Sequence, residues 1–217
     1  MSAAYGGRPV LHDIDLMVRP GEVVGVSGPS GSGKTTLLNV IAGLTDPESG
    51  SVRLSGVTLT DTEVLVEKDK RNLMLAGQDA VLDREHNVAA NIATGLPRDK
   101  QRRRVGAHRV AMMMDLFELP TPLADSLPRH LSAGERQRIA LARAIVGFGL
   151  GGPEAAVLLD EPLSAVEIAT RIRLLQAVIS DVGRQPLPIV LVSHDPAEIA
   201  AVADRHTALV DGRLVPV

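Results

Sequence analysis

The sequence contains no cysteine, which excludes a disulfide scaffold, a zinc site built from thiolates and a cysteine nucleophile. Aromatic residues are scarce as well, with one Tyr, two Phe and no Trp among 217 residues. Proteins that stack the bases of single-stranded nucleic acid need several aromatic faces, so this class is disfavoured. The charge is nearly balanced, with 23 Lys and Arg against 26 Asp and Glu. A net charge of −3 gives no sign of a polyanionic partner, so no nucleic-acid partner is expected.

Long apolar segments are also lacking. No run reaches the roughly 18–20 apolar residues that a helix needs to cross a bilayer, and Met1–Gly7 has no signal-peptide core. We therefore expect a cytosolic protein without a membrane span. The 45 % hydrophobic and 23 % charged residues are the balance of an ordinary globular protein.

Short apolar runs alternate with longer stretches of helical periodicity, which predicts an α/β fold with a mainly parallel sheet. Strands are expected at 22–27, 51–59, 155–159 and 188–192, and a hairpin at 208–215 that turns at Asp211-Gly212. A helix is expected at 33–42, ending at Gly43, and a helical region at 87–147 with breaks at Pro97 and 120–128. One domain with an inserted helical lobe is the simplest organisation.

A glycine-rich segment, 28–35, has the pattern G-x-x-x-x-G-K-[ST] and lies between a predicted strand and a predicted helix. Its glycines let successive N–H groups point into a nest for an anion, and the following helix adds its N-terminal partial charge. Lys34 is expected to reach the β- and γ-phosphates of a nucleotide, and Thr35 to offer its hydroxyl to Mg²⁺. The nucleotide-binding residues expected here are Gly28, Pro29, Ser30, Gly31, Ser32, Gly33, Lys34, Thr35 and Thr36.

The same segment has two other interpretations. One is a glycine-rich turn with an incidental lysine. The other is a dinucleotide-binding turn, which is disfavoured because Lys34-Thr35-Thr36 stands where that turn needs a third glycine.

The predicted strand at 155–159 is followed by Asp160, Glu161 and Pro162. Ligands of open parallel sheets bind at the carboxyl ends of the strands, where the glycine-rich loop is also expected. Asp160 is suited to hold Mg²⁺ through water, and Glu161 to take a proton from an attacking water. The alternative is a polar strand end that leads into a loop.

Leu131-Ser132-Ala133-Gly134-Glu135 resembles the signature Leu-Ser-Gly-Gly-Gln of the ATP-binding cassette (ABC) ATPases. In that family the helix that begins here faces the γ-phosphate held by a second subunit, which implies Ser132 and Gly134 as ATP contacts. Ser132 and Glu135 also have the spacing of a capping box, so the segment could serve only to start a helix. Both roles are compatible, because a capped helix N-terminus is itself an anion site.

Three more residues match the family in order and spacing. Gln78 resembles the glutamine that links the metal site to the helical lobe, and His194 resembles the switch histidine after a strand. Tyr5 resembles the aromatic residue that stacks on adenine; a surface position is its alternative. The resemblance implies that Glu161, His194, Gln78 and Lys34 are catalytic. It further implies that Thr35, Gln78 and Asp160 hold the metal.

The chain departs from the family at several positions. Ala133 replaces a glycine, Glu135 replaces a glutamine, and Glu167 stands where the loop after the catalytic glutamate usually ends in aspartate. The few residues before Tyr5 imply that the family's first strand is missing or shortened.

The basic run 98–104 is interpreted as a solvated helix face, with contact to anionic lipid headgroups as the alternative.

The resemblance implies one ABC ATPase domain over 1–217: a P-loop NTPase core with a mainly parallel sheet, a small antiparallel β lobe, and a helical lobe at about 79–147. It implies ATP and Mg²⁺ as cofactors, and a homodimer or a paired ABC subunit that encloses two MgATP. Separate transmembrane permease subunits are expected partners, and a solute-binding protein an indirect one. The expected location is the cytoplasmic side of the membrane, and the importer class is favoured. A soluble ABC ATPase that acts on DNA or the ribosome, or a small-molecule kinase, is the alternative.

Overall fold

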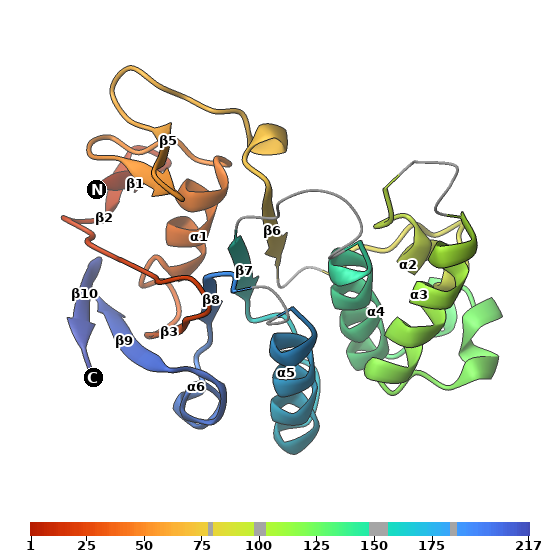
Figure 1. Cartoon of the computed structure of the whole chain (residues 1–217). Coiled ribbons are helices and arrows are strands. Elements are labelled where there is room, and N and C mark those ends of the chain that lie inside the picture. Colours follow the sequence, from red (N-terminus) through yellow and green to blue (C-terminus); the bar gives the residue numbers. More distant parts are fainter. Residues whose placement is uncertain (78–79, 98–102, 148–155, 183–185) are drawn as a thin grey trace. The chain divides into compact units, whose positions relative to one another are not determined.

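The computed structural model describes residues 1–77, 80–97, 103–147, 156–182 and 186–217. The chain divides into two compact units. The first contains 1–75, 153–161 and 185–217, and the second contains 76–152 and 162–184. In Figure 1 the first unit holds the red and orange N-terminal part and the blue C-terminal strands, and the second holds the green helices.

The first unit is built on a six-stranded sheet of order β10-β9-β3-β8-β7-β6. The strands are β3 (Val23–Ser27), β6 (Leu73–Ala76), β7 (Ala156–Asp160), β8 (Ile189–Val192), β9 (Arg205–Val210) and β10 (Arg213–Pro216). β3 runs parallel to β8 and β9, and β7 runs parallel to β8. Every residue of β3, β7 and β8 is buried. Val, Ile and Leu runs suit such strands, since both faces of a parallel sheet are covered. The predicted sheet is confirmed.

Two small antiparallel pairs belong to the same unit: β1 (Ala3–Tyr5) with β2 (Arg8–Leu11), and β4 (Val52–Leu54) with β5 (Val57–Thr60). The expected antiparallel lobe is therefore present, and the N-terminal strand has three residues. β9 and β10 form the predicted hairpin. Its turn residues have positive φ, 47° at Asp211 and 73° at Gly212, as a tight two-residue turn requires.

Helix α1 (Lys34–Ala42) follows the glycine-rich loop and ends, as predicted, at Gly43 in the left-handed conformation. The 3₁₀ turn η1 (Lys68–Lys70) and helix α6 (Pro196–Val202) complete the elements described for this unit. Apolar side chains of α1, β3, β7 and β8 form one core, among them Leu37, Leu38, Val24, Val26, Leu158 and Val192.

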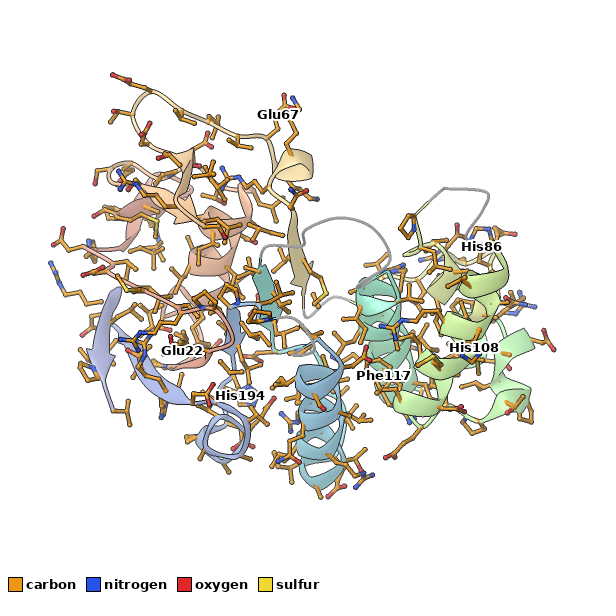
Figure 2. The ribbon with its side chains drawn as sticks, viewed as in Figure 1. Glu22, Glu67, His86, His108, Phe117 and His194 are labelled. Carbon is orange, nitrogen blue, oxygen red and sulfur yellow. The ribbon has the colours of Figure 1, made fainter. Side chains whose placement is uncertain are left out.

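The second unit is helical. It contains α2 (Val88–Ala93), α3 (Arg103–Leu116), the 3₁₀ turns η3 (Thr121–Asp125) and η4 (Pro128–His130), α4 (Ala133–Ile145) and α5 (Ile168–Val182). Helix α2 packs on α3 and α4, and α3 also contacts α5. Phe117, labelled in Figure 2, is fully buried in this unit. Helix α5 lies within this unit, which is therefore larger than the predicted lobe at 79–147. No helix in the described parts of the chain has the length and hydropathy of a membrane span.

Arg71 is a buried cation at the C-terminal end of α1. Only 2 % of it is exposed. Its Nη1 donates to the carbonyl oxygens of Val40 at 3.1 Å and Ile41 at 2.9 Å, and its Nε donates to Val66 O at 2.8 Å. Its Nη2 donates to the Thr60 hydroxyl. A positive charge at this end of a helix is favourable, since the last carbonyls carry partial negative charge. Arg71 therefore joins α1 to the loop and strand that follow β4.

Replacing Arg71 with methionine removes these donors, so the carbonyl oxygens of Ile41 and Val66 and the buried hydroxyl of Thr60 lose the hydrogen bonds that Arg71 gives them. We expect Arg71→Met to lower the free energy of unfolding by about 2–4 kcal/mol, which corresponds to roughly 5–15 °C in the melting temperature of a chain this size. Differential scanning calorimetry measures the change. Arg53→Met, at an exposed position of β4, is the control and should shift melting by no more than about 2 °C. Equal melting of the two variants would contradict this role.

Candidate nucleotide and metal site

The glycine-rich loop connects β3 to α1, as predicted. Gly31 and Gly33 have φ of 80° and 102°, values that L-residues rarely adopt. At Gly33 a side chain would also collide, because its Cβ would lie 2.8 Å from Val10 Cγ1. Ser32 N donates to Pro29 O at 3.2 Å and closes a turn within the loop. Loop residues 28–33 therefore curl before the helix begins, and Thr36 lies in its first turn.

Lys34 is buried, with 6 % of its surface exposed, and its Nζ donates to Gly28 O at 2.8 Å and Pro29 O at 3.0 Å. Its ammonium group therefore lies across the loop. Within the described residues, the N-terminus of α1 has no side-chain cap and no acidic residue in its first turn. Ser32 Oγ is buried there without a hydrogen-bond partner in the described chain. These groups fit a bound phosphate, which would accept hydrogen bonds from them.

The side chains of Thr35 and Asp160 lie next to each other and offer oxygen atoms suited to a metal ion. The Thr35 side chain hydrogen-bonds to the carboxylate of Asp160, which is itself buried at the end of β7. Burial raises the pKa of Asp160; the hydroxyl of Thr35 and the charge of Lys34 act against this, while the charge of Glu161 adds to it. The described residues contain no cluster of three or more metal-ligating side chains. Mg²⁺ does not need one, since it is commonly bound by one or two carboxylates together with substrate phosphates and water.

Glu161 lies one residue after β7 and is paired with His194. The distance from His194 Nδ1 to Glu161 Oε2 is 2.9 Å. Glu161 N donates to Val192 O at 3.0 Å, which extends the β7–β8 ladder by one bond. The backbone of Glu161 is left-handed, with φ of 45°, an unfavourable conformation for a residue with a side chain. The Glu161 carboxylate is only 17 % exposed, so its position is restrained by the backbone and by the imidazole.

His194 lies in the short segment between β8 and α6, where Figure 2 labels it. The residues on both sides of it are held by hydrogen bonds. The buried hydroxyl of Ser193 donates to Glu198 Oε2 at 2.8 Å and accepts from Asp195 N at 3.0 Å. Asp195 in turn caps α6 by accepting from Ala197 N at 2.9 Å. The side chain of His194 is 56 % exposed, so more than half of it is accessible to a ligand.

The signature-like segment starts α4, in the second unit. Ser132 caps the helix and forms the capping box with Glu135: Ser132 Oγ accepts from Glu135 N at 3.2 Å, and Glu135 Oε2 accepts from Ser132 N at 2.8 Å. The hydrogen bond from the Ser132 side chain to Glu135 lowers the pKa of that carboxyl. The capping role is thus confirmed. The phosphate contacts of Ser132 and Gly134 stay predictions.

The structure brings together three of the predicted sets: Lys34 with its loop, Thr35 with Asp160, and Glu161 with His194. Gln78 lies outside the described residues, as do residues 98–102 of the basic run. Tyr5 lies in β1, and its contact with adenine stays a prediction.

One polar residue of the second unit escaped the sequence analysis. Gln137 is buried on α4 and hydrogen-bonds to Ser164 and Ala165. Gln137 stands four and eight residues before the buried Leu141 and Ile145, so it lies on the apolar face of the helix. A polar residue at such a position is the pattern in the sequence that could have identified it.

Comparison with known proteins matches residues 11–164 to the ABC transporter family. The Fe(3+) ions import ATP-binding protein FbpC of Pseudomonas fluorescens is 38 % identical over 98 % of this chain. The spermidine/putrescine import ATP-binding protein PotA of Frankia alni is 39 % identical over 95 %. The chain spans 58 % of the length of the former and 42 % of the latter.

Solved structures of the bacterial ABC transporter cassette MJ0796 have the same fold. The dimeric structure superposes with a TM-score of 0.81 at 27 % identity, and covers 98 % of this chain and 93 % of that one. The dimer in a post-hydrolysis state, bound to ADP and Pi, gives a TM-score of 0.78 at 27 % identity, with 98 % and 92 % covered.

The glycine-rich loop, with Lys34 directly after it, is called the phosphate loop below and leads to a testable prediction. Lys34→Ala removes the buried ammonium and should weaken ATP binding by about 10–100-fold, the weight of a hydrogen bond from a charged group. Isothermal titration with ATP measures the affinity. Lys70→Ala is the matched control, since the side chain of Lys70 is 71 % exposed and pairs with Glu67 at the surface. An unchanged affinity of Lys34→Ala would refute the assignment of this loop.

Proposed function

This chain belongs to the ABC transporter family, and from that membership we propose that it binds and hydrolyses ATP to power transport of a solute through separate permease subunits. The observation that carries the proposal is the pairing of Glu161 with His194 beside the Thr35–Asp160 pair, in the unit that also holds the phosphate loop. A phosphate loop alone serves many nucleotide-dependent reactions. The restrained carboxylate of Glu161, which directly follows β7, favours transfer of a phosphoryl group to water.

In this proposal the loop 28–33 and the first turn of α1 hold the phosphates of ATP through their N–H groups. Lys34 leaves its carbonyl partners and reaches the β- and γ-phosphates. Thr35 and Asp160 hold Mg²⁺, with Gln78 as a third ligand implied by the family. Bound Mg²⁺ supplies charge neutralisation on the phosphate oxygens. Tyr5 contributes a face for adenine.

Hydrolysis needs a group that accepts the proton of the attacking water. Glu161 is suited to this because its backbone and His194 restrain the carboxylate. As the water oxygen bonds to the γ-phosphorus, the bond from that phosphorus to the leaving oxygen of ADP breaks, and Glu161 takes the proton. With Glu161 ionised, the Nδ1–H of His194 donates to its carboxylate and orients it. The exposed face of His194 is directed to solvent and can contact the γ-phosphate.

A complete site is proposed to need a second copy or a paired ABC subunit. Ser132 and Gly134 begin α4, whose N-terminal N–H groups carry partial positive charge. In the dimer they contact the γ-phosphate bound by the other subunit, so that two MgATP are enclosed. The dimeric structures of MJ0796 support this arrangement, one of them with ADP and Pi bound.

We infer that the partners are transmembrane permease subunits on the cytoplasmic side of the membrane. The relatives are import ATP-binding proteins, which favours the importer class. Iron(III) and polyamine import occur among them, so the resemblance leaves the solute open. A solute-binding protein would act indirectly, through the permease.

The second unit has a hollow of about 570 Å³ that suits such a contact. Val81 on its rim is 71 % exposed. Arg84, Arg129 and Arg136 outnumber Glu85 among its lining residues. A helix of the permease with an apolar face and an acidic residue would complement this surface.

The central prediction concerns Glu161 as the general base of hydrolysis. Glu161→Gln keeps the size of the side chain and loses the basic carboxylate, so hydrolysis should fall by about 10²–10⁴-fold while ATP still binds. Phosphate release and ATP titration measure the two properties. Glu63→Gln, at an exposed position, should leave both unchanged. Near-normal turnover of Glu161→Gln would remove Glu161 from this role.

The transport function is tested by partner capture. Tagged Glu161→Gln protein, loaded with ATP, is used to capture partners from detergent-solubilised native membranes, and these are identified by mass spectrometry. A polytopic membrane protein that is absent with the tagged Lys34→Ala control supports the proposal. Recovery of only ribosomal, DNA-bound or other soluble partners would overturn it.

A further inference from the structure

Helix α4 carries a buried glutamine, Gln137, whose side-chain amide hydrogen-bonds to a loop of the same unit. Gln137 is 7 % exposed. Its Nε2 donates to Ser164 Oγ at 3.0 Å, and its Oε1 accepts from Ala165 N at 2.7 Å. Both ends of the amide are therefore satisfied by consecutive residues of the segment 162–167. An apolar side chain at this position would leave Ala165 N without that partner.

A second contact brings the same loop against the first turn of α4. A Cβ at Gly134 would lie 3.2 Å from Ala165 O and 3.5 Å from Val166 Cγ2. A side chain at Gly134 would therefore be tight against the loop. It is also closed on itself, since Val166 N donates to Leu163 O at 2.9 Å and Leu163 is fully buried. Gln137 and Gly134 together hold a compact turn.

The two segments joined in this way have separate roles in the proposed function. Ser132 and Gly134 open α4 and are proposed to contact the nucleotide of the other subunit. The loop is the continuation of the chain after Glu161, with Ser164 only three residues further on. Catalysis of this kind depends on position, and a displacement of about 1 Å can cost 10²-fold in rate.

We propose that Gln137 is a positioning residue for hydrolysis: by fastening the loop that follows Glu161 to the first turns of α4, it restrains the chain directly after the catalytic carboxylate. The inference rests on the proposed ATPase function. Gln137 itself touches no substrate. It acts through Ser164 and Ala165, and the binding of ATP to the phosphate loop does not depend on it.

The test uses Gln137→Leu, which keeps much of the side-chain volume and removes both hydrogen bonds. We expect kcat for ATP hydrolysis to fall by about 10–100-fold, while the dissociation constant for ATP changes less than about twofold. Gln176→Leu, on the exposed face of α5 in the same unit, is the matched control and should retain the wild-type kcat. Each rate is divided by the folded fraction of that variant, which is measured by circular dichroism.

Ser164→Ala provides a milder variant that is expected to fold, since it removes one hydroxyl. It should lower kcat by about 2–10-fold, the weight of one hydrogen bond. In the double variant with Gln137→Leu it should add nothing further, because the bond is already lost.

The outcomes separate this inference from the function on which it rests. A wild-type chain that hydrolyses ATP, together with an unchanged kcat in Gln137→Leu or fully multiplicative effects in the double variant, would overturn the positioning role alone. A parallel loss of ATP affinity would also overturn it, since the role would then be structural. Absence of hydrolysis in the wild type would instead contradict the proposed function.

Discussion

The parallel register of β7 against β8 is the constraint on which the rest of the site depends. It pairs Asp160 with Val192, and Glu161 N donates one step further on to Val192 O. The register thereby brings the carboxylate of Glu161 to the imidazole that follows two residues after Val192. A slip by one residue would turn every side chain of β7 to the opposite face and would separate both carboxylates from Thr35 and His194.

The phosphate loop depends in a similar way on packing at some distance from it. Helix α1 presents its positive end to the loop and its negative end to the buried guanidinium of Arg71. Its middle is fastened to the sheet by Leu37 and Leu38. The N–H groups at the start of α1 are therefore oriented before any ligand arrives, which reduces the reorganisation that binding requires. In the proposed function, Lys34 is the part of this arrangement that moves, from the carbonyl oxygens of Gly28 and Pro29 to the phosphates.

Much of this could be predicted from the sequence because it is local. The loop pattern, the strands and the end of α1 at Gly43 depend on neighbours in the chain, and so does the capping box of Ser132 and Glu135. The rest depends on contacts between distant segments. The left-handed Glu161 is paired with β8 through Val192, and Arg71 is bonded to the end of α1 from 30 residues away. Gln137 is bonded to a loop 27 residues away. The family resemblance supplied Gln78 and Tyr5, whose roles stay predictions.

We have proposed that the first unit transfers the γ-phosphoryl group of ATP to water. Hydrolysis of MgATP by the purified chain in ¹⁸O-water, with the released phosphate analysed by mass spectrometry, tests this reaction. We expect ADP and inorganic phosphate that contains one oxygen from the solvent. Formation of ADP without labelled phosphate would show transfer to another acceptor, and no formation of ADP would show that no hydrolysis takes place; either result would refute the proposed reaction.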